Sequence, residues 1–74
     1  MQYGHIKINI ENQLAAKNLS KNKFSQRAEL QRTQLNKYIN NDIVLLNIDV
    51  LARMCTVLEC NISDILEFIP PEKS

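Results

Sequence analysis

The sequence predicts an all-α fold, a compact bundle of five short helices that a short N-terminal strand can precede. Three observations support this prediction. With 74 residues, of which 45% are hydrophobic, the chain can form one domain over residues 1–74 around a small core. Apolar residues recur at helical spacing through most of the chain. Residues that cap helices separate these periodic segments.

The chain begins with an extended segment and a first helix. Ile6, Ile8 and Ile10 alternate with polar residues, which is the period of a β-strand. Asn9 is the expected cap of a helix that starts at Ile10 and ends near Asn18.

Two helices follow in the middle of the chain. Ser20 is a natural N-cap for the second helix, which we expect to run to about Ala28. The third should begin near Arg32 and end at Asn40 and Asn41. Asn suits that end because it tolerates the left-handed conformation that closes a helix.

The last two helices share one apolar spacing. Asn47 is the expected cap of the fourth. In the fifth, Asn61 and Asp64 occupy capping-box positions, and Pro70 and Pro71 end the helix. The spacing i, i+3, i+4, i+7 is set by Leu51, Met54, Cys55 and Leu58 in the fourth helix and by Ile62, Ile65, Leu66 and Ile69 in the fifth. The side chains that we expect to be buried are Leu35, Leu51, Met54, Leu58, Ile65 and Leu66.

The third predicted helix is apolar on one side and rich in long donors on the other. Its apolar side carries Leu35, Tyr38 and Ile39, which continue the face that Phe24 and Ala28 form on the second helix. The side chains that could reach a base edge or a phosphate are Arg32, Thr33, Gln34, Asn36 and Lys37. A helix of this kind fits the major groove of DNA.

The net charge of +1 hides an uneven distribution. Residues 1–41 carry seven Lys and Arg against two Asp and Glu, a balance of +5, whereas residues 42–74 carry two against six, a balance of −4. An ordinary solvated surface can segregate in this way, but a basic half also suits a polyanionic partner.

Several classes of protein are not expected. The longest apolar run, Ile43 to Leu46, is far shorter than the roughly 20 residues of a membrane span, and no apolar signal region is visible at the N-terminus. A soluble intracellular protein is therefore expected. Cys55 and Cys60 lie five residues apart and His5 is the single histidine, so we expect no metal site and no cofactor. With neither a nucleophile motif nor a Gly-rich loop, we expect no enzyme.

The chain resembles the Cro/C1-type helix-turn-helix family, the phage-repressor-like (XRE family) transcriptional regulators. The resemblance extends from about Ile6 to Pro70 and rests on the helix order, the short loop between the second and third helices, and the segments NLSKNKFS and LNIDVLARMCTVLECNISDIL. It implies a lambda-repressor-like DNA-binding fold with its helix-turn-helix core at about residues 20–40. It also implies a cytoplasmic protein encoded by a bacterium, a phage or a mobile element.

The resemblance assigns base-reading roles in the third helix. These positions fall on Arg32, Thr33 and Gln34, and a later one falls on Lys37, with Asn36 beside it. Arg makes paired hydrogen bonds to guanine, Gln can do so to adenine, and the Thr methyl can meet that of thymine. The same residues also suit the solvated side of an amphipathic helix.

The family's phosphate-contacting position at the start of the second helix falls on Lys21. Further candidates for phosphate contacts, which solvated charges or helix caps explain equally well, are Lys17, Lys23, Arg27, Asn40 and Asn41.

Two positions depart from the family pattern. Glu29 stands in the turn where Gly is usual, which costs about 1 kcal/mol if the left-handed conformation is kept and otherwise distorts the turn. Ser25 stands where a small apolar residue is common. Its hydroxyl needs a partner, which we expect to be a backbone carbonyl of its own helix.

The expected function is a sequence-specific, double-stranded DNA-binding transcriptional regulator that acts by occupying an operator, without a small-molecule effector. An alternative from another class is a protein-interaction module of helix-turn-helix shape, antitoxin-like or an anti-repressor subunit, without specific DNA readout. RNA binding has less support because the chain lacks the stacking aromatic residues of single-strand recognition.

We expect a homodimer on DNA, with recognition helices about 34 Å apart on a roughly palindromic operator. Two segments could form its interface, because a free strand edge invites pairing. They either pair as a ribbon within one chain or exchange between subunits. Their apolar residues are Met1, Tyr3, Ile6 and Ile8 at one end of the chain and Phe68 and Ile69 at the other.

Overall fold

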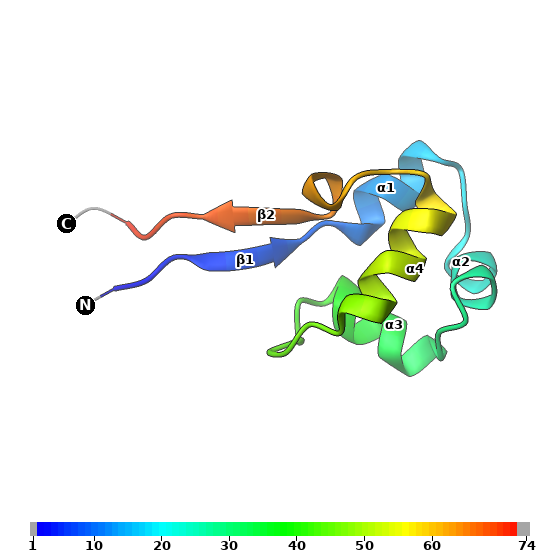
Figure 1. Cartoon of the computed structure of the whole chain (residues 1–74), viewed down its shortest axis with the longest axis horizontal. Coiled ribbons are helices and arrows are strands. Elements are labelled where there is room, and N and C mark those ends of the chain that lie inside the picture. Colours follow the sequence, from blue (N-terminus) through cyan, green and yellow to red (C-terminus); the bar gives the residue numbers. More distant parts are fainter. Residues whose placement is uncertain (1, 73–74) are drawn as a thin grey trace.

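The computed structural model describes residues 2–72, so Met1 lies outside the described part of the chain. Within that part there are four α-helices, one short 3-10 turn and one two-stranded antiparallel sheet (Figure 1). In chain order the elements are β1 (His5–Ile8), α1 (Ile10–Ala16), α2 (Lys21–Arg27), α3 (Arg32–Ile39), α4 (Ile48–Leu58), η1 (Ile62–Asp64) and β2 (Leu66–Ile69). The molecule is 43 Å long and 22 and 18 Å across, because the sheet projects from the helical body as a ribbon (Figure 1).

The predicted fifth helix is wrong. Its first residues form the single turn η1, in which Asp64 Oδ2 accepts the backbone N–H of Asn61 at 2.9 Å, and its remaining residues form β2. Two turns of helix contribute little stability by themselves. Pairing with β1 instead provides backbone hydrogen bonds across the ribbon and brings Leu66 opposite Ile8. The short capped turn therefore forms as expected, but after Ile65 tertiary pairing makes the four residues of β2 a strand.

The expected N-terminal strand is confirmed, and it pairs with β2 within one chain. The register joins His5 to Ile69, Ile6 to Phe68, and Ile8 to Leu66. Both ends of the described chain lie at the far end of this ribbon (Figure 1).

One hydrophobic core holds the helices together. Of the residues expected there, Leu35, Leu51, Met54, Leu58 and Ile65 are buried, and Leu66 is half-buried against them. The other buried apolar side chains are Ile8, Ile10, Leu14, Phe24, Ala28, Leu30, Tyr38 and Val50. Ile8 is the point at which the ribbon enters the core.

Side-chain caps start two of the helices as predicted. Ser20 Oγ accepts the N–H of Lys23 at 3.2 Å, and Asn47 Oδ1 accepts the N–H of Asp49 at 2.9 Å. The first helix begins after Asn9, as expected, but Asn9 makes no side-chain cap. Its amide donates instead to Glu67 Oε1 at 3.1 Å, which ties the start of α1 to β2.

Every α-helix of the described chain is followed, one or two positions after its last residue, by a residue with positive φ, and none of these residues is glycine. The residues and their φ angles are Asn18 at 53°, Glu29 at 56°, Asn41 at 60° and Glu59 at 52°. In each case the next residue's N–H returns to a carbonyl of the last helical turn, for example Leu30 N to Ser25 O at 2.8 Å. The turn at Glu29 therefore keeps its left-handed conformation and carries the expected strain.

Candidate nucleic-acid interface

The turn between α2 and α3 is short and anchored in the core. Ala28 and Leu30, on either side of Glu29, are buried in the core. Glu29 itself has the left-handed conformation, and its side chain is exposed to solvent. Ser25 is buried too, and its hydroxyl donates to the carbonyl of Asn22 at 2.9 Å. The predicted partner of that hydroxyl, a carbonyl of its own helix, is thereby confirmed.

Helix α3 presents two contrasting sides. Leu35 and Tyr38 are almost fully buried, with exposed fractions of 0% and 2%, and Ile39 is half-buried. Of the predicted base-reading residues, Gln34 is half-buried, and those exposed to solvent are Arg32, Thr33, Asn36 and Lys37. The side chains that sequence reasoning assigned to the core and to the polar side thus separate on the folded helix.

Arg32 connects the two helices of the unit. Its Nη1 donates to Asn22 Oδ1 in the first turn of α2, and its Nε donates to Asn36 Oδ1 at 3.5 Å. The guanidinium is therefore held at the junction of α2 and α3 by neutral acceptors. Sequence reasoning did not single out Asn22, because ten residues separate it from Arg32 and no motif links them.

Arg53 was also missed, although it supports the same unit from α4. Its Nε donates to the carbonyl of Ala28 at the end of α2, at 2.9 Å, and its Nη1 pairs with Asp49 Oδ2 at 2.6 Å. The i, i+4 spacing of Asp49 and Arg53 was the available signal. The contact with Ala28 shows that Arg53 positions the turn.

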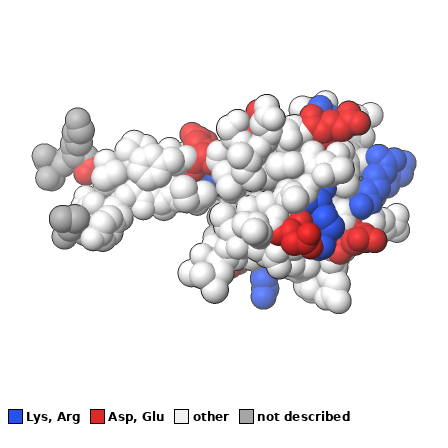
Figure 2. All heavy atoms as spheres, viewed as in Figure 1, with Lys and Arg blue, Asp and Glu red and all other residues white. Residues whose placement is uncertain are grey.

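The predicted phosphate-contacting cations surround α2. Lys21 and Lys23 lie in its first turn, Arg27 ends it, and Lys17 follows α1. All four side chains are exposed. On the face shown in Figure 2, Lys and Arg lie at the end of the body that α2 forms, and the described residues of the ribbon, 2–8 and 66–72, include one cation, Lys7. The basic charge of the first half of the chain is thus concentrated on the helical body.

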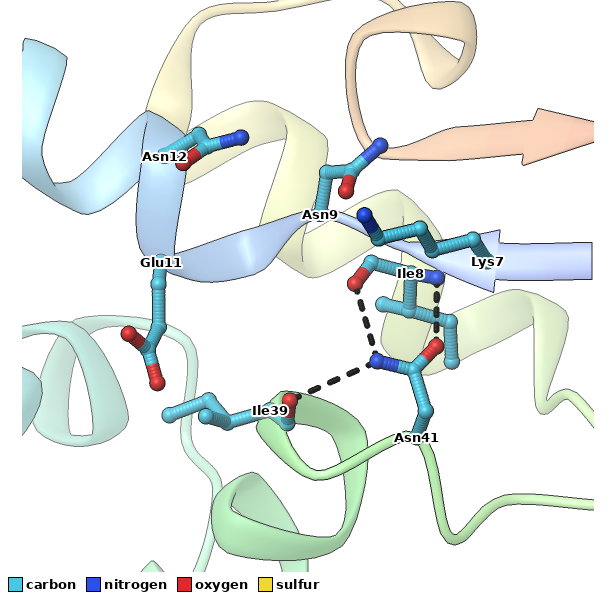
Figure 3. Close-up of a pocket in the computed structure, with 7 residues that line it drawn as sticks. All are labelled: Lys7, Ile8, Asn9, Glu11, Asn12, Ile39 and Asn41. Atoms are coloured by element: carbon cyan, nitrogen blue, oxygen red, sulfur yellow. Dashed lines mark hydrogen bonds between the residues drawn. The ribbon is translucent and has the colours of Figure 1, made fainter.

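Asn40 and Asn41 end α3 in different ways. Asn40 is exposed at the C-cap. The Asn41 side chain reaches from the end of α3 to β1, where Oδ1 accepts the N–H of Ile8 at 2.7 Å and Nδ2 donates to the carbonyl of Ile8 at 3.2 Å (Figure 3). The side-chain amide of Asn41 is thus engaged within the chain, and its backbone N–H donates to the carbonyl of Tyr38 at 3.3 Å.

The part of the chain that the structure describes contains no group of three or more His, Cys, Asp or Glu side chains that could hold a metal ion. Cys55 and Cys60 are free and half-buried. Burial, with the neighbouring Cys55, raises the pKa of the Cys60 thiol. Across residues 2–72, no helix has the length and apolar character needed to cross a membrane.

Comparison with known proteins agrees with this geometry. The sequence matches the family model of the Cro/C1-type HTH DNA-binding domain over residues 9–71. The transcriptional regulator VanUg has a similar structure, with a TM-score of 0.75 and 21% identity over 95% of this chain and 92% of that one. A chain of the SinR protein/SinI protein complex has a TM-score of 0.68 and 18% identity over 74% of this chain and 53% of that one. At these identities the likeness concerns the fold. No curated protein sequence matches.

Proposed function

This chain belongs to the Cro/C1-type helix-turn-helix family of DNA-binding domains, and we propose that it regulates transcription by occupying a specific double-stranded operator. The observation that carries the proposal is that α3 exposes its polar side to solvent. The opposite side is anchored in the core by the buried side chains of Leu35 and Tyr38. A helix anchored in this way can enter the major groove as a rigid unit.

The proposed readout begins at the N-terminal turn of α3. Arg32 would give up its two amide acceptors, Asn22 and Asn36, for the O6 and N7 atoms of a guanine. These acceptors are neutral, so the exchange does not break an ion pair. Before DNA arrives they hold the guanidinium at the junction of α2 and α3, beside the other polar side chains of α3. Thr33, Gln34, Asn36 and Lys37 would complete the readout along the same helix.

The proposed backbone contacts surround this readout. Lys21 and Lys23, at the start of α2, would neutralise phosphates on one strand, with Lys17 and Arg27 nearby. The end of α3 would add the exposed side-chain amide of Asn40 as a donor to a phosphate, and Asn41 would join it by giving up one of its bonds within the chain. Such contacts set the register of the protein on the duplex and carry no sequence information themselves.

The proposed mechanism involves no chemistry. One recognition helix covers only a few base pairs, so two copies on two half-sites about 34 Å apart would supply specificity in a genome. The bound pair would then block polymerase or present a surface to it.

Selection of bound duplexes from a random oligonucleotide pool tests the proposal. We expect an enriched motif of two related half-sites, with a guanine among its invariant positions. The control is the triple variant Arg32→Ala, Gln34→Ala, Lys37→Ala, which keeps the buried side of α3 and should enrich nothing. Recovery of random sequences by the unaltered protein, at about 150 mM salt, would contradict specific readout.

A further inference from the structure

A concave surface lies outside the helix-turn-helix unit, between β1 and the segment that connects α3 to α4. It has a volume of about 660 Å³, which gives room for several side chains. We call this surface the apolar notch, and the residues that line it are His5, Ile6, Lys7, Asn41, Ile43 and Val44.

The connection that forms one wall of the notch is unusually apolar for an exposed segment. It contains the longest apolar run of the chain, residues 43–46. Val44 and Leu45 are 94% and 87% exposed, and Ile48, which starts α4, is 82% exposed. Loops of small proteins are mostly polar, and neighbouring exposed apolar side chains mark interaction surfaces.

The ribbon forms the other wall and carries an apolar side of its own. Ile6 and Phe68 lie opposite each other and are 51% and 63% exposed. They share a face with Ile8 and Leu66, so the apolar side of the ribbon leaves the core and continues into solvent. The Phe68 ring lies against Gly4, where a Cβ would be 2.8 Å from two ring carbons. A two-stranded ribbon is marginally stable by itself, so this projecting part needs a cover.

The backbone of β1 also points into the notch. The N–H and C=O of Ile8 face away from β2, because both bond to the amide of Asn41. In an antiparallel pair these directions alternate, so the N–H and C=O of Ile6 point to the same outer edge. A strand edge of this kind is a template for another chain.

We propose that the apolar notch binds a second copy of this chain, the ribbon of each copy entering the notch of the other about a two-fold axis. A surface that contains both a projecting apolar ribbon and an apolar hollow is complementary to itself, as a two-fold interface requires. The charges at its margin suit the same symmetry, since Lys7 lies on the strand wall and Asp42 precedes the loop wall. Among the described residues of the ribbon, 2–8 and 66–72, Lys7 is the one Lys or Arg, which gives this end little charge to hold DNA.

The area of the surface fits this occupant. The exposed parts of five side chains amount to roughly 700 Å² per copy, close to the ~800 Å² that each partner contributes to a standard interface. Two of these side chains, Ile6 and Val44, line the notch, and the other three are exposed on the same loop, on the first residue of α4 and on the ribbon, namely Leu45, Ile48 and Phe68. The association itself does not depend on DNA. Only the joint use of two α3 helices on one operator rests on the proposed function.

Sedimentation equilibrium of the full chain without DNA tests the inference. We expect a dimer at micromolar concentration and at least a tenfold weaker dimer for the double variant Val44→Asp, Leu45→Asp. Both side chains are almost fully exposed, so the variant should keep the fold, which circular dichroism verifies. Phe68→Glu, at the position of the ribbon paired with the notch residue Ile6, should weaken the dimer as well. The matched control is Ile62→Asp in η1, an exposed apolar residue outside the notch, which should leave it unchanged.

A monomer at every concentration up to the millimolar range would overturn the inference, as would a dimer that both notch variants leave intact. Binding to a duplex with a single half-site separates this outcome from the proposed function. If the notch serves assembly, the Val44→Asp, Leu45→Asp variant binds that duplex as tightly as the unaltered chain does. Loss of half-site binding in this variant would place the loop on DNA and overturn the inference.

Discussion

The side-chain amide of Asn41 pairs with both backbone groups of Ile8, accepting its N–H at 2.7 Å and donating to its carbonyl at 3.2 Å (Figure 3). The amide thereby takes the place of a neighbouring strand on the outer edge of β1. The backbone of the same residue, at a φ of 60°, ends α3. One residue thus joins the end of α3 to the ribbon.

Replacing Asn41 with Gly should destabilise the protein by about 1–3 kcal/mol, because it leaves the N–H and C=O of Ile8 without their partner. Gly retains the left-handed backbone that ends α3, so the change removes the side chain alone. Asn41→Asp, which keeps an acceptor for the N–H and loses the donor, should fall between. Urea unfolding measures both. A Gly variant as stable as the original chain would show that the pairing contributes nothing.

Glu29→Gly and Glu59→Gly should each stabilise the protein by about 0.5–1 kcal/mol. Both residues have positive φ, where a side chain costs about 1–2 kcal/mol, and the greater freedom of Gly in the unfolded chain offsets part of the gain. Thermal unfolding should show a rise of several degrees for a domain of this size. Glu29→Ala is the matched control, since it removes the same carboxylate and keeps the strain. Equal stability of the Ala and Gly variants would mean that no strain resides in the turn.

Arg32→Ala should lose about 1–3 kcal/mol of operator affinity and relax the preference at one base pair, because it removes a paired base contact. Lys21→Ala should weaken binding to all sequences alike and make the salt dependence shallower by about one unit. Titrations of operator and mismatched duplexes at several salt concentrations distinguish the two. The same sequence-independent loss in both variants would refute the assignment of readout to Arg32.

Leu51→Ala should cost about 2–5 kcal/mol, a large part of the stability of so small a domain, because Leu51 is only 6% exposed and faces the core from α4. The matched control is Leu45→Ala, which removes the same atoms from a side chain that is 87% exposed and should change stability by less than about 0.5 kcal/mol. Denaturant unfolding of the isolated chain measures both. A small loss in the Leu51 variant would mean that α4 does not contribute this side chain to the core.

Local patterns were sufficient for most of the helical body. The caps at Ser20 and Asn47 and the apolar spacing of α4 depend on residues within one or two turns of each other, so their effects can be read along the chain. The contrast between the two sides of α3 is local in the same way. The resemblance of the sequence to a known family placed the candidate base-reading residues on that helix, and their roles remain predictions.

The remaining features depend on contacts between distant residues. Residues 66–69 have an apolar spacing that suits a helix, yet they form β2. They do so because Leu66 pairs with Ile8, which is 58 positions away in the sequence. The contact of Arg53 with Ala28 spans 25 residues, and that of Asn41 with Ile8 spans 33. Likewise, the apolar run at residues 43–46 resembles core sequence, and only the packing of the helices leaves it largely exposed. Helix periodicity and capping are properties of neighbouring residues, which the sequence by itself determines. Strand pairing and the exposure of a loop depend on which distant side chains already fill the core. Only the tertiary structure therefore decides them.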